Sequence, residues 1–325
     1  MSKVLVPGGA GYIGAHTCKA LAEAGFEPVV LDDLRAGHED FVRWGPLHRV
    51  DLTDRAAVAR VIAEEKPVAA IHFAASIEVG ESIRNPSGFY WNNVVNALGL
   101  FDALVAAEVG AVVFSSTAAV YGTPETAPIP EDHPTLPINP YGETKLAVER
   151  ALKWYGEAYG LRSTALRYFN AAGADPDGAI GEAHDPETHL IPLVIEAVLG
   201  RRPSIKVFGT DYDTPDGTAI RDYIHVADLA AAHVAALQRL LAGGGSLTAN
   251  LGTGRGWSVR EVIDAVARVA GRPVPAEEAP RRAGDPARLV ADPSRAQAEL
   301  DWTARHSDLD TIVRTALAWH KKRNG

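Results

Sequence analysis

The chain has 325 residues, of which 46% are apolar, and a formal net charge of −9. The length allows two domains or one large domain with an insertion, and the apolar fraction is enough for a full-sized core. The negative charge repels nucleic acid, so an anionic substrate would need local arginines. The sequence has no run of 18 apolar residues and no signal-peptide pattern, so we expect no membrane span. Cys18 is the only cysteine, which excludes an internal disulfide and fits a reducing cytoplasm.

The first 170 residues alternate short apolar runs with longer helical patterns, which predicts a parallel sheet with crossover helices. In chain order we expect a strand over 4–6, a helix over 12–24, and strands over 28–31, 68–73, 111–115 and 163–166. Residues 172–216 are rich in Gly, Pro, Asp and Thr and contain one clear helix, over 193–199. The alternating pattern then returns, with a helix over 227–241, a strand over 248–251, a helix over 259–270 and a proline- and arginine-rich segment near 273–293.

Three glycines lie directly after the first expected strand and open the first expected helix. In this context Gly8 allows a tight turn, Gly11 lets backbone N–H groups approach a pyrophosphate, and Gly14 lets the helix and strand pack closely. The helix N-terminus adds a partial positive charge where the phosphates would lie. The sequence therefore predicts a dinucleotide-binding turn.

The second expected strand ends in Asp32 and Asp33, eighteen and nineteen residues beyond Gly14. A carboxylate at this place accepts hydrogen bonds from the adenosine ribose hydroxyls and repels a 2′-phosphate. This favours NAD over NADP, although Arg35 lies close enough to weaken the inference.

These patterns predict an α/β protein, with a Rossmann-type doubly wound parallel sheet and a smaller, discontinuous α/β substrate-binding domain. We expect an NAD-binding domain over 1–171 plus 220–250. The substrate domain would then comprise 172–219 plus 251–325.

A tyrosine and a lysine four residues apart open a long predicted helix. Asn139 is suited to the N-cap and Pro140 to the first helical position. Tyr141 and Lys145 would share one face, with Cβ atoms about 5–6 Å apart. Because a free tyrosine has a pKa of about 10, forming its phenolate at pH 7 costs about 4 kcal/mol. The lysine ammonium, an oxidised nicotinamide ring and the helix dipole all favour the phenolate, so Tyr141 is a candidate general base for a sugar hydroxyl.

Ser115, Ser116 and Thr117 close the fifth expected strand, at the carboxyl edge where open α/β sheets bind ligands. Thr117 is placed to hydrogen-bond the reacting hydroxyl and to share its proton with Tyr141. The alternative is that these hydroxyls only cap the strand end.

Eight motifs are spread over nearly the whole chain: Gly-Gly-Ala-Gly-Tyr-Ile-Gly (8–14), His-Phe-Ala-Ala (72–75), Val-Gly-Glu-Ser (79–82), Ser-Ser-Thr-Ala-Ala-Val-Tyr-Gly (115–122), Pro-Tyr-Gly-Glu-Thr-Lys (140–145), Arg-Tyr-Phe-Asn (167–170), Arg-Asp-Tyr-Ile-His-Val (221–226) and Arg-Arg-Ala-Gly-Asp (281–285). Together they resemble the extended short-chain dehydrogenase/reductase family. The sixth and seventh motifs, in this order, are typical of its sugar-nucleotide epimerases.

The resemblance implies NAD-dependent epimerisation at C4 of UDP-hexoses, interconverting UDP-galactose and UDP-glucose through a transient 4-keto sugar. The implied catalytic residues are Tyr141, Lys145 and Thr117. A retained NAD would be held by Gly8, Gly11, Tyr12, Ile13, Gly14, Asp32, Asp33, Asp51, Leu52, Phe73, Ala74, Asn92, Ser115, Tyr141, Lys145 and Tyr168. The UDP-sugar would be held by Thr117, Asn170, Leu190, Phe208, Arg221, Arg282 and Asp285. A homodimer formed through helices of the NAD-binding domain is also implied.

Two of the implied substrate residues also make sense from their chemistry. Arg221 and Arg282 supply forked donors for a diphosphate, which offsets the repulsive overall charge. Asp285 is suited to accept hydrogen bonds from ribose hydroxyls. The alternative for Arg221 is an ion pair with Asp222 that braces the turn.

The chain departs from the family pattern at four positions. Pro7 replaces a usual threonine, Ile77 a common lysine near the cofactor, and His189 a frequent asparagine beside the substrate. Leu289 stands where the family often has an aromatic or small residue near C2 of the sugar, which leaves acceptance of N-acetylated sugars open.

One further cluster and the cysteine carry weaker signals. His184, Asp185, Glu187 and His189 have a metal-like composition, but their spacing favours a solvated loop without a metal. Cys18, inside the first expected helix, is expected to serve packing.

Two other functions remain open. A nucleotide-sugar 4,6-dehydratase on the same fold typically has an Asp-Glu pair after the active-site threonine, whereas Ala118 and Ala119 follow Thr117 here. A non-catalytic NAD-sensing protein need not keep the Tyr141, Lys145 and Thr117 set.

Overall fold

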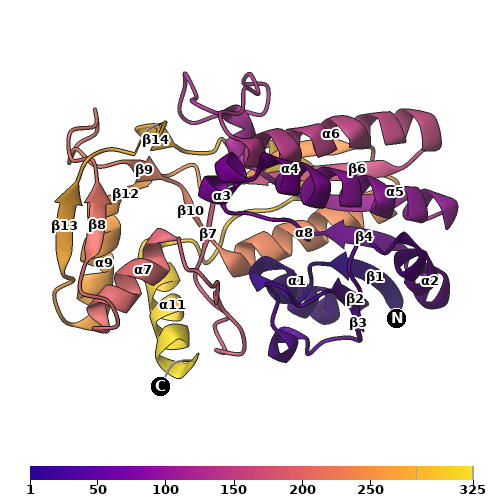
Figure 1. Ribbon diagram of the computed structural model, residues 1–325, viewed down its shortest axis with the longest axis horizontal. Coiled ribbons are helices and arrows are strands. Elements are labelled where there is room, and N and C mark those ends of the chain that lie inside the picture. The colour runs from indigo at the N-terminus through magenta and orange to yellow at the C-terminus, as the bar shows by residue number, and fades with distance from the viewer. Residues whose placement is uncertain (283, 324–325) are drawn as a thin grey trace.

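The computed structural model describes residues 1–282 and 284–323. Residue 283, inside the 281–285 motif, and residues 324–325 of the expected substrate domain lie outside the described residues. A large sheet with its helices forms one end of the molecule, and a group of short strands and helices forms the other (Figure 1). Within the described ranges, none of the helices combines the length and apolar character needed to cross a lipid bilayer.

The large sheet has seven strands in the order β11-β6-β5-β4-β1-β2-β3, and all of its pairings are parallel. The strands are β1 (Ser2–Pro7), β2 (Phe26–Asp32), β3 (Leu47–Arg49), β4 (Ala69–His72), β5 (Ala111–Thr117), β6 (Arg162–Tyr168) and β11 (Leu247–Leu251). The expected strands are confirmed, and β3 is the one strand of this sheet that the sequence pattern did not predict. Because the strands are parallel, the carboxyl ends of β1, β2, β5 and β6 meet at one edge.

Helices cover both faces of this sheet, as in a doubly wound fold (Figure 1). On one face lie α1 (Tyr12–Glu23) and α8 (Val226–Leu241), and on the other α2 (Arg55–Glu65), α5 (Asn96–Ala106) and α6 (Pro140–Tyr159). Strand β5 shows the two-sided burial, because Val113 packs in the core beneath α8 while Val112 and Phe114 pack beneath α5 and α6. The predicted α/β class and Rossmann-type sheet are therefore confirmed.

The segment between β4 and β5 contains short helices that no sequence pattern predicted. These are α3 (Val79–Arg84), α4 (Pro86–Phe89) and the π-helical turn η2 (Tyr90–Val95), which leads into α5. Pro86 begins α4, and the Asn85 side chain accepts a hydrogen bond from the Gly88 N–H at 3.0 Å. Such one-turn elements carry too few residues to show a helical period.

The smaller group is built from three short sheets. They are β10 (Tyr223–His225) with β7 (Asn170–Ala172), β13 (Ala276–Ala279) with β8 (Ile205–Phe208), and β9 (Ile220–Arg221) between β12 (Trp257–Ser258) and β14 (Arg288–Leu289).

Helices α7 (Leu190–Val198), α9 (Val259–Ala270) and α11 (Leu309–Arg323) share a core in this group. The expected helix over 259–270 is confirmed, and the one expected over 193–199 begins three residues earlier. Helix α10 (Ser294–Leu300), like α11, was missed, and it packs on the large sheet beside α8.

Candidate active site

The glycine-rich turn joins β1 to α1 and leaves no space for side chains at two of its three expected positions. Gly8 has a φ of +83°, and a Cβ there would lie 2.5 Å from the backbone nitrogen of Ala74. A Cβ on Gly14 would lie 2.2 Å from the carbonyl oxygen of Gly8. A Cβ on Gly11 would meet no described atom closer than 3.4 Å, and Gly11 as N-cap leaves the first N–H groups of α1 without a capping side chain. The turn therefore offers backbone donors and space to an anion such as a dinucleotide diphosphate.

The acidic residues at the end of β2 are held by backbone N–H groups and by one arginine. Asp32 accepts hydrogen bonds from the N–H groups of Ala10 at 3.0 Å and Leu34 at 2.9 Å. Arg35 forms ion pairs with Asp33 and, at 3.2 Å, with Asp51. The structure thus brings the two expected ribose-side carboxylates close to Asp51, an expected NAD contact, and Arg35 is engaged by Asp33 and Asp51.

Tyr141, Lys145 and Thr117 lie together at the carboxyl edge of the sheet. The predicted caps of α6 are confirmed, since the Asn139 side chain accepts a hydrogen bond from the Gly142 N–H at 2.9 Å and Pro140 begins the helix. A Cβ on Gly142 would lie 2.6 Å from the carbonyl oxygen of Ala119, so the first turn of α6 packs closely on the chain that follows Thr117.

Lys145 is fixed between the end of β5 and the tyrosine. Its Nζ donates a hydrogen bond to the carbonyl oxygen of Ser115 at 2.9 Å and lies 6.0 Å from the centre of the Tyr141 ring. Thr117 accepts a hydrogen bond from the Ala119 N–H at 3.1 Å, so it caps the strand end, and its side chain also hydrogen-bonds Tyr141. The strand-end cap is therefore present, and the contact with Tyr141 leaves the predicted catalytic role of Thr117 open as well.

Burial sets the protonation of the tyrosine and the lysine. It lowers the pKa of Lys145 to about 7, although the Glu149 carboxylate acts in the opposite direction. It raises the pKa of Tyr141, and the Thr117 hydrogen bond only partly offsets this. The protein's own groups therefore do not produce the expected acidic phenol, because the desolvation of Tyr141 outweighs them.

A buried ion pair behind Lys145 was missed in the sequence analysis. Arg167 Nε donates to Glu149 at 2.9 Å, both side chains are 8% exposed, and Ser116 also donates to Glu149. Glu149 follows Lys145 by four residues and so lies on the same face of α6, which is the signal that points to it. The pair supplies the one carboxylate that counteracts the desolvation of Lys145.

Several of the other expected cofactor residues lie at or after the ends of β1, β4, β5 and β6 or contact residues there. Ser115 and Tyr168 share a hydrogen bond between their hydroxyls, and Asn92 donates to Ser76 at 3.1 Å. Pro7 accepts hydrogen bonds through its carbonyl oxygen from the N–H groups of Phe73 at 2.8 Å and Ala74 at 2.9 Å. The departure at Pro7 thus leaves the contact between β1 and the chain after β4 intact.

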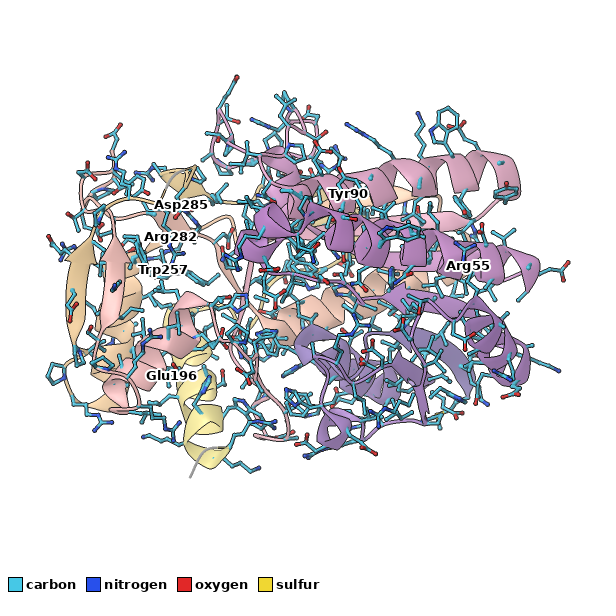
Figure 2. All side chains as sticks on the ribbon, in the orientation of Figure 1. Arg55, Tyr90, Glu196, Trp257, Arg282 and Asp285 are labelled. Atoms are coloured by element: carbon cyan, nitrogen blue, oxygen red, sulfur yellow. The ribbon has the colours of Figure 1, made fainter. Side chains whose placement is uncertain are left out.

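Six of the seven expected substrate residues, all except Thr117, lie in the smaller group, where Figure 2 shows Arg282 and Asp285 at the same end of the molecule as Trp257. Arg221 pairs with Asp285 at 3.1 Å, while the Asp222 carboxylate accepts hydrogen bonds from the N–H groups of Thr253, Gly254 and Ala291. The alternative pairing of Arg221 with Asp222 is therefore wrong, because the backbone satisfies Asp222.

Two further contacts define the same region. The Arg282 guanidinium lies 4.0 Å from the centre of the Phe208 ring, and Leu289 in β14 is paired in register with Arg221. Asn170 begins β7 and Leu190 begins α7, so both stand at element ends.

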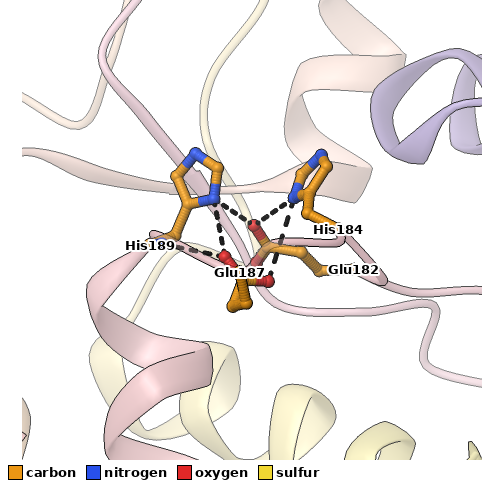
Figure 3. A group of neighbouring side chains, drawn as sticks. All are labelled: Glu182, His184, Glu187 and His189. Carbon is orange, nitrogen blue, oxygen red and sulfur yellow. Dashed lines mark hydrogen bonds and ion pairs between the residues drawn. The ribbon is translucent and has the colours of Figure 1, made fainter. Parts of the chain in front are cut away.

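The expectation of a solvated loop is met only in part, because Asp185 is exposed and the His189 side chain is 40% exposed, whereas the Glu187 side chain is buried. The Glu182 and Glu187 side chains are 4% and 9% exposed, and both contact His184 and His189 (Figure 3). Asp185 is exposed and lies outside this group. Glu182 takes the place in the cluster that was expected for Asp185. Burial acts against the ionised forms, but the carboxylates raise the pKa of His189 and the imidazoles lower that of Glu182. Cys18 is buried in the core, as expected.

Comparison with known proteins gives matches over the whole chain. A sequence model of the NAD dependent epimerase/dehydratase family matches residues 4–252. The UDP-glucose 4-epimerase of Rhizobium meliloti (strain 1021) is 55% identical over 323 residues, which are 99% of this chain and 98% of that protein. The UDP-glucose 4-epimerase from Brucella ovis in complex with NAD has a TM-score of 0.96 at 52% identity, with 98% of each chain covered. The enzyme from Bifidobacterium longum in complex with NAD⁺ and UDP has a TM-score of 0.93 at 38% identity, with 99% of each chain covered.

Proposed function

This chain belongs to the NAD-dependent epimerase/dehydratase family, and we propose that it epimerises UDP-hexoses at C4, interconverting UDP-galactose and UDP-glucose with a retained NAD. The observation that carries the proposal is the meeting of Thr117, Tyr141 and Lys145 at the sheet edge next to the glycine-rich turn. The similarity in sequence and structure to UDP-glucose 4-epimerases over the whole chain supports it.

The glycine-rich turn and the acidic residues near β2 suit NAD. The N–H groups at the start of α1 would hold the diphosphate, Asp32 and Asp33 would hold the adenosine ribose, and Asp51 would be a further NAD contact. The other cofactor contacts we propose are Gly8, Gly11, Tyr12, Ile13, Gly14, Leu52, Phe73, Ala74, Asn92, Ser115, Tyr141, Lys145 and Tyr168. Bound NAD supplies the hydride acceptor for C4 and carries a positive charge on its nicotinamide ring.

Proton transfer is the work of the chain's own residues. Tyr141 takes the proton of the sugar 4-hydroxyl. Thr117, which is hydrogen-bonded to the Tyr141 side chain, orients that sugar hydroxyl. Lys145 stabilises the phenolate when it is protonated. Because burial disfavours both charged groups, the positive nicotinamide ring is the additional charge that makes the phenol acidic enough.

The smaller group of strands would bind the UDP-sugar. Arg221 and Arg282 suit the diphosphate, and the Phe208 ring beside Arg282 offers a flat surface to the base. Asp285 is held by Arg221 and remains available to ribose hydroxyls. Thr117, Asn170 and Leu190 complete the substrate contacts we propose.

We propose the domain division already expected from the sequence, with 1–171 plus 220–250 for NAD and 172–219 plus 251–325 for the substrate. The contact of α10 with the large sheet ties the second part to the first. The single buried cysteine supports a cytoplasmic location.

We also propose a homodimer formed through helices of the large sheet. Its supporting feature is a set of exposed apolar side chains on α3, η2 and α6. They are Ile83, Trp91, Trp154 and Tyr159, which are 62–64% exposed.

The dehydratase alternative lacks its acid–base pair here. Ala118 and Ala119, in the short helix η3 (Ala118–Tyr121) after Thr117, have no side chain that could assist the removal of water. A 6-deoxy-4-keto product is therefore not expected.

The test uses purified protein with UDP-galactose and no added NAD. We expect UDP-glucose to form, with the hydrogen at C4 retained rather than exchanged with solvent. A 6-deoxy-4-keto sugar would instead establish the dehydratase, and the absence of any turnover by protein that contains NAD would refute the catalytic proposal.

A further inference from the structure

We call the sheet edge that holds Thr117, Tyr141 and Lys145 the catalytic edge. Away from it, the loop between β7 and α7 carries four converging side chains, from Glu182, His184, Glu187 and His189 (Figure 3). One ligand atom from each can be chosen so that all lie within 4.8 Å of one another. His189 Nδ1 is 2.9 Å from an oxygen of each glutamate, and His184 Nδ1 is 3.1 Å from Glu182 and 3.9 Å from Glu187. The second ring nitrogen of each histidine points away from the carboxylates (Figure 3).

These separations suit a tetrahedral metal ion. Nitrogen and oxygen ligands lie about 2.0–2.2 Å from Zn²⁺, which places tetrahedral ligand atoms roughly 3.3 Å from one another. The nitrogen-to-oxygen separations in the loop fall on both sides of this value. Imidazole with carboxylate is also a donor set suited to Zn²⁺ and Co²⁺ rather than to Mg²⁺ or Ca²⁺.

The charges of the cluster also call for a cation. Glu182 and Glu187 are almost fully buried, and two carboxylates close together in such surroundings are costly without compensating positive charge. Metal ligation requires both imidazoles to be neutral, so a dication would take the place of the proton that the two carboxylates favour on His189 and would balance their charges.

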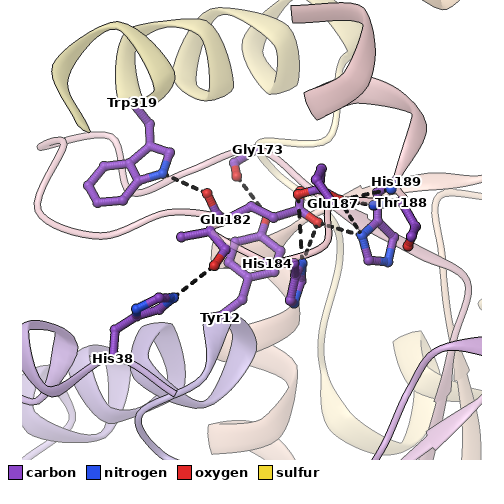
Figure 4. A network of polar contacts seen from close by, with 10 residues as sticks. Tyr12, His38, Gly173, Glu182, His184, Glu187, Thr188, His189 and Trp319 are labelled. Carbon is purple, nitrogen blue, oxygen red and sulfur yellow. Dashed lines mark hydrogen bonds and ion pairs between the residues drawn. The ribbon is translucent and has the colours of Figure 1, made fainter. Parts of the chain in front are cut away.

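The ligands are held in place by a surrounding network (Figure 4). Glu187 accepts hydrogen bonds from the N–H groups of Thr188 at 2.7 Å and His189 at 2.8 Å. The Trp319 ring N–H in α11 donates to the Glu182 carbonyl oxygen at 2.8 Å. Such outer contacts fix ligand orientation in metal sites.

The same network connects the loop to the large sheet (Figure 4). Tyr12 at the start of α1 donates to the carbonyl oxygen of Gly173 at 2.6 Å, and His38 contacts the carbonyl oxygen of Ala183 at 2.7 Å. A metal in the loop would therefore stiffen the contact between α1 and α11.

We propose that Glu182, His184, Glu187 and His189 form a binding site for one divalent transition-metal ion of the Zn²⁺ and Co²⁺ class. Four protein ligands close the coordination sphere, so the ion serves structure and not catalysis. It holds the 182–189 loop, and with it the start of α7, against the large sheet.

The experiment uses the untagged full chain, stripped with a chelator and titrated with CoCl₂. We expect one Co²⁺ per chain, with the intense visible absorption of a tetrahedral complex, displacement by ZnSO₄ and a higher midpoint of thermal unfolding. His184→Gln and Glu182→Gln should each weaken Co²⁺ binding by more than the roughly 10–100-fold that the loss of an outer contact costs. His306→Gln changes an exposed histidine outside the cluster and should bind Co²⁺ as the unaltered chain does.

Two results would overturn the site. One is a stripped chain that binds no Co²⁺ at millimolar concentration, which would leave the cluster as imidazoles hydrogen-bonded to carboxylates. The other is equal Co²⁺ binding by His184→Gln and the unaltered chain, with circular dichroism showing both folded.

Discussion

The catalytic edge and the 182–189 loop both hold ionisable side chains away from solvent, yet burial has opposite outcomes in the two places. At the edge, burial lowers the pKa of Lys145 to about 7 because Glu149 is the one carboxylate acting against it. In the loop, Glu182 and Glu187 outweigh burial and raise the pKa of His189. The nearby charges, and not the burial itself, decide which form is favoured.

The difference indicates what each region still requires. The edge has a phenol and an amine whose charged forms are disfavoured, so a positive cofactor ring completes it. The loop has two buried carboxylates, so a proton or a metal ion completes it. One region is therefore prepared for transient charge during a reaction, and the other for a permanent cation.

The largest effect is expected from removing the phenol at the catalytic edge. Tyr141→Phe should lower kcat roughly 10²–10⁴-fold, since it takes away the proton acceptor. Tyr155→Phe is the matched control, because Tyr155 lies on the same helix but its hydroxyl bonds Asp102. Steady-state kinetics with UDP-galactose measures both, and near-normal turnover by Tyr141→Phe would show that another group is the base.

A change within the loop should affect stability instead. In a chelator, Glu182→Gln should lower the free energy of unfolding by about 1–3 kcal/mol, because it leaves His184 and His189 with Glu187 as their remaining buried carboxylate partner. Asp185→Asn is the control, and as an exposed residue outside the cluster it should stay within about 0.5 kcal/mol of the unaltered chain. Urea unfolding measures both variants. An equal loss of unfolding free energy in the two would mean that the buried Glu182 contributes no more to stability than the exposed Asp185.

The pH dependence of stability separates the two regions further. The pKa of Lys145 is about 7 in the folded protein and 10.5 unperturbed, so the unfolded chain holds the extra proton between these values. Stability in cofactor-free protein should therefore gain up to about 1.4 kcal/mol per pH unit from this group as pH rises from 7 towards 10.5. Lys145→Met should remove this gain, which urea unfolding at several pH values measures. Parallel pH profiles for the two proteins would show that Lys145 stays charged on folding.

The catalytic edge could be predicted from the sequence because its residues follow regular elements. Tyr141 and Lys145 share a helix face, and Thr117 ends a strand, so local spacing and the parallel sheet are enough to bring them together. Glu149 lies on the same helix face, four residues after Lys145, so the same spacing could have predicted its place beside Lys145.

The loop and the smaller group could not be predicted in this way. Glu182 lies in an irregular loop with no periodic pattern. The Trp319 ring N–H donates to its carbonyl oxygen, and Tyr12 holds the same loop at Gly173, so both contacts come from residues far away in sequence. The partner of Arg221 is Asp285, 64 residues along the chain, instead of the adjacent Asp222. Pairing of this kind depends on tertiary contacts that spacing does not reveal.

The smallest effect is expected from Arg282, an exposed residue that can be compared with the buried residues of the catalytic edge and the 182–189 loop. Arg282 is exposed and lies over the Phe208 ring, so water screens whatever it contributes to binding a UDP-sugar. Arg282→Ala should raise KM about 10-fold at unchanged kcat, because it removes binding that the substrate and the transition state share equally. Arg281→Ala is the matched control, since Arg281 stacks on Tyr212 and pairs with Asp211. If the two variants raise KM equally, the effect comes from the general field of the two arginines and not from a contact of Arg282 with the substrate.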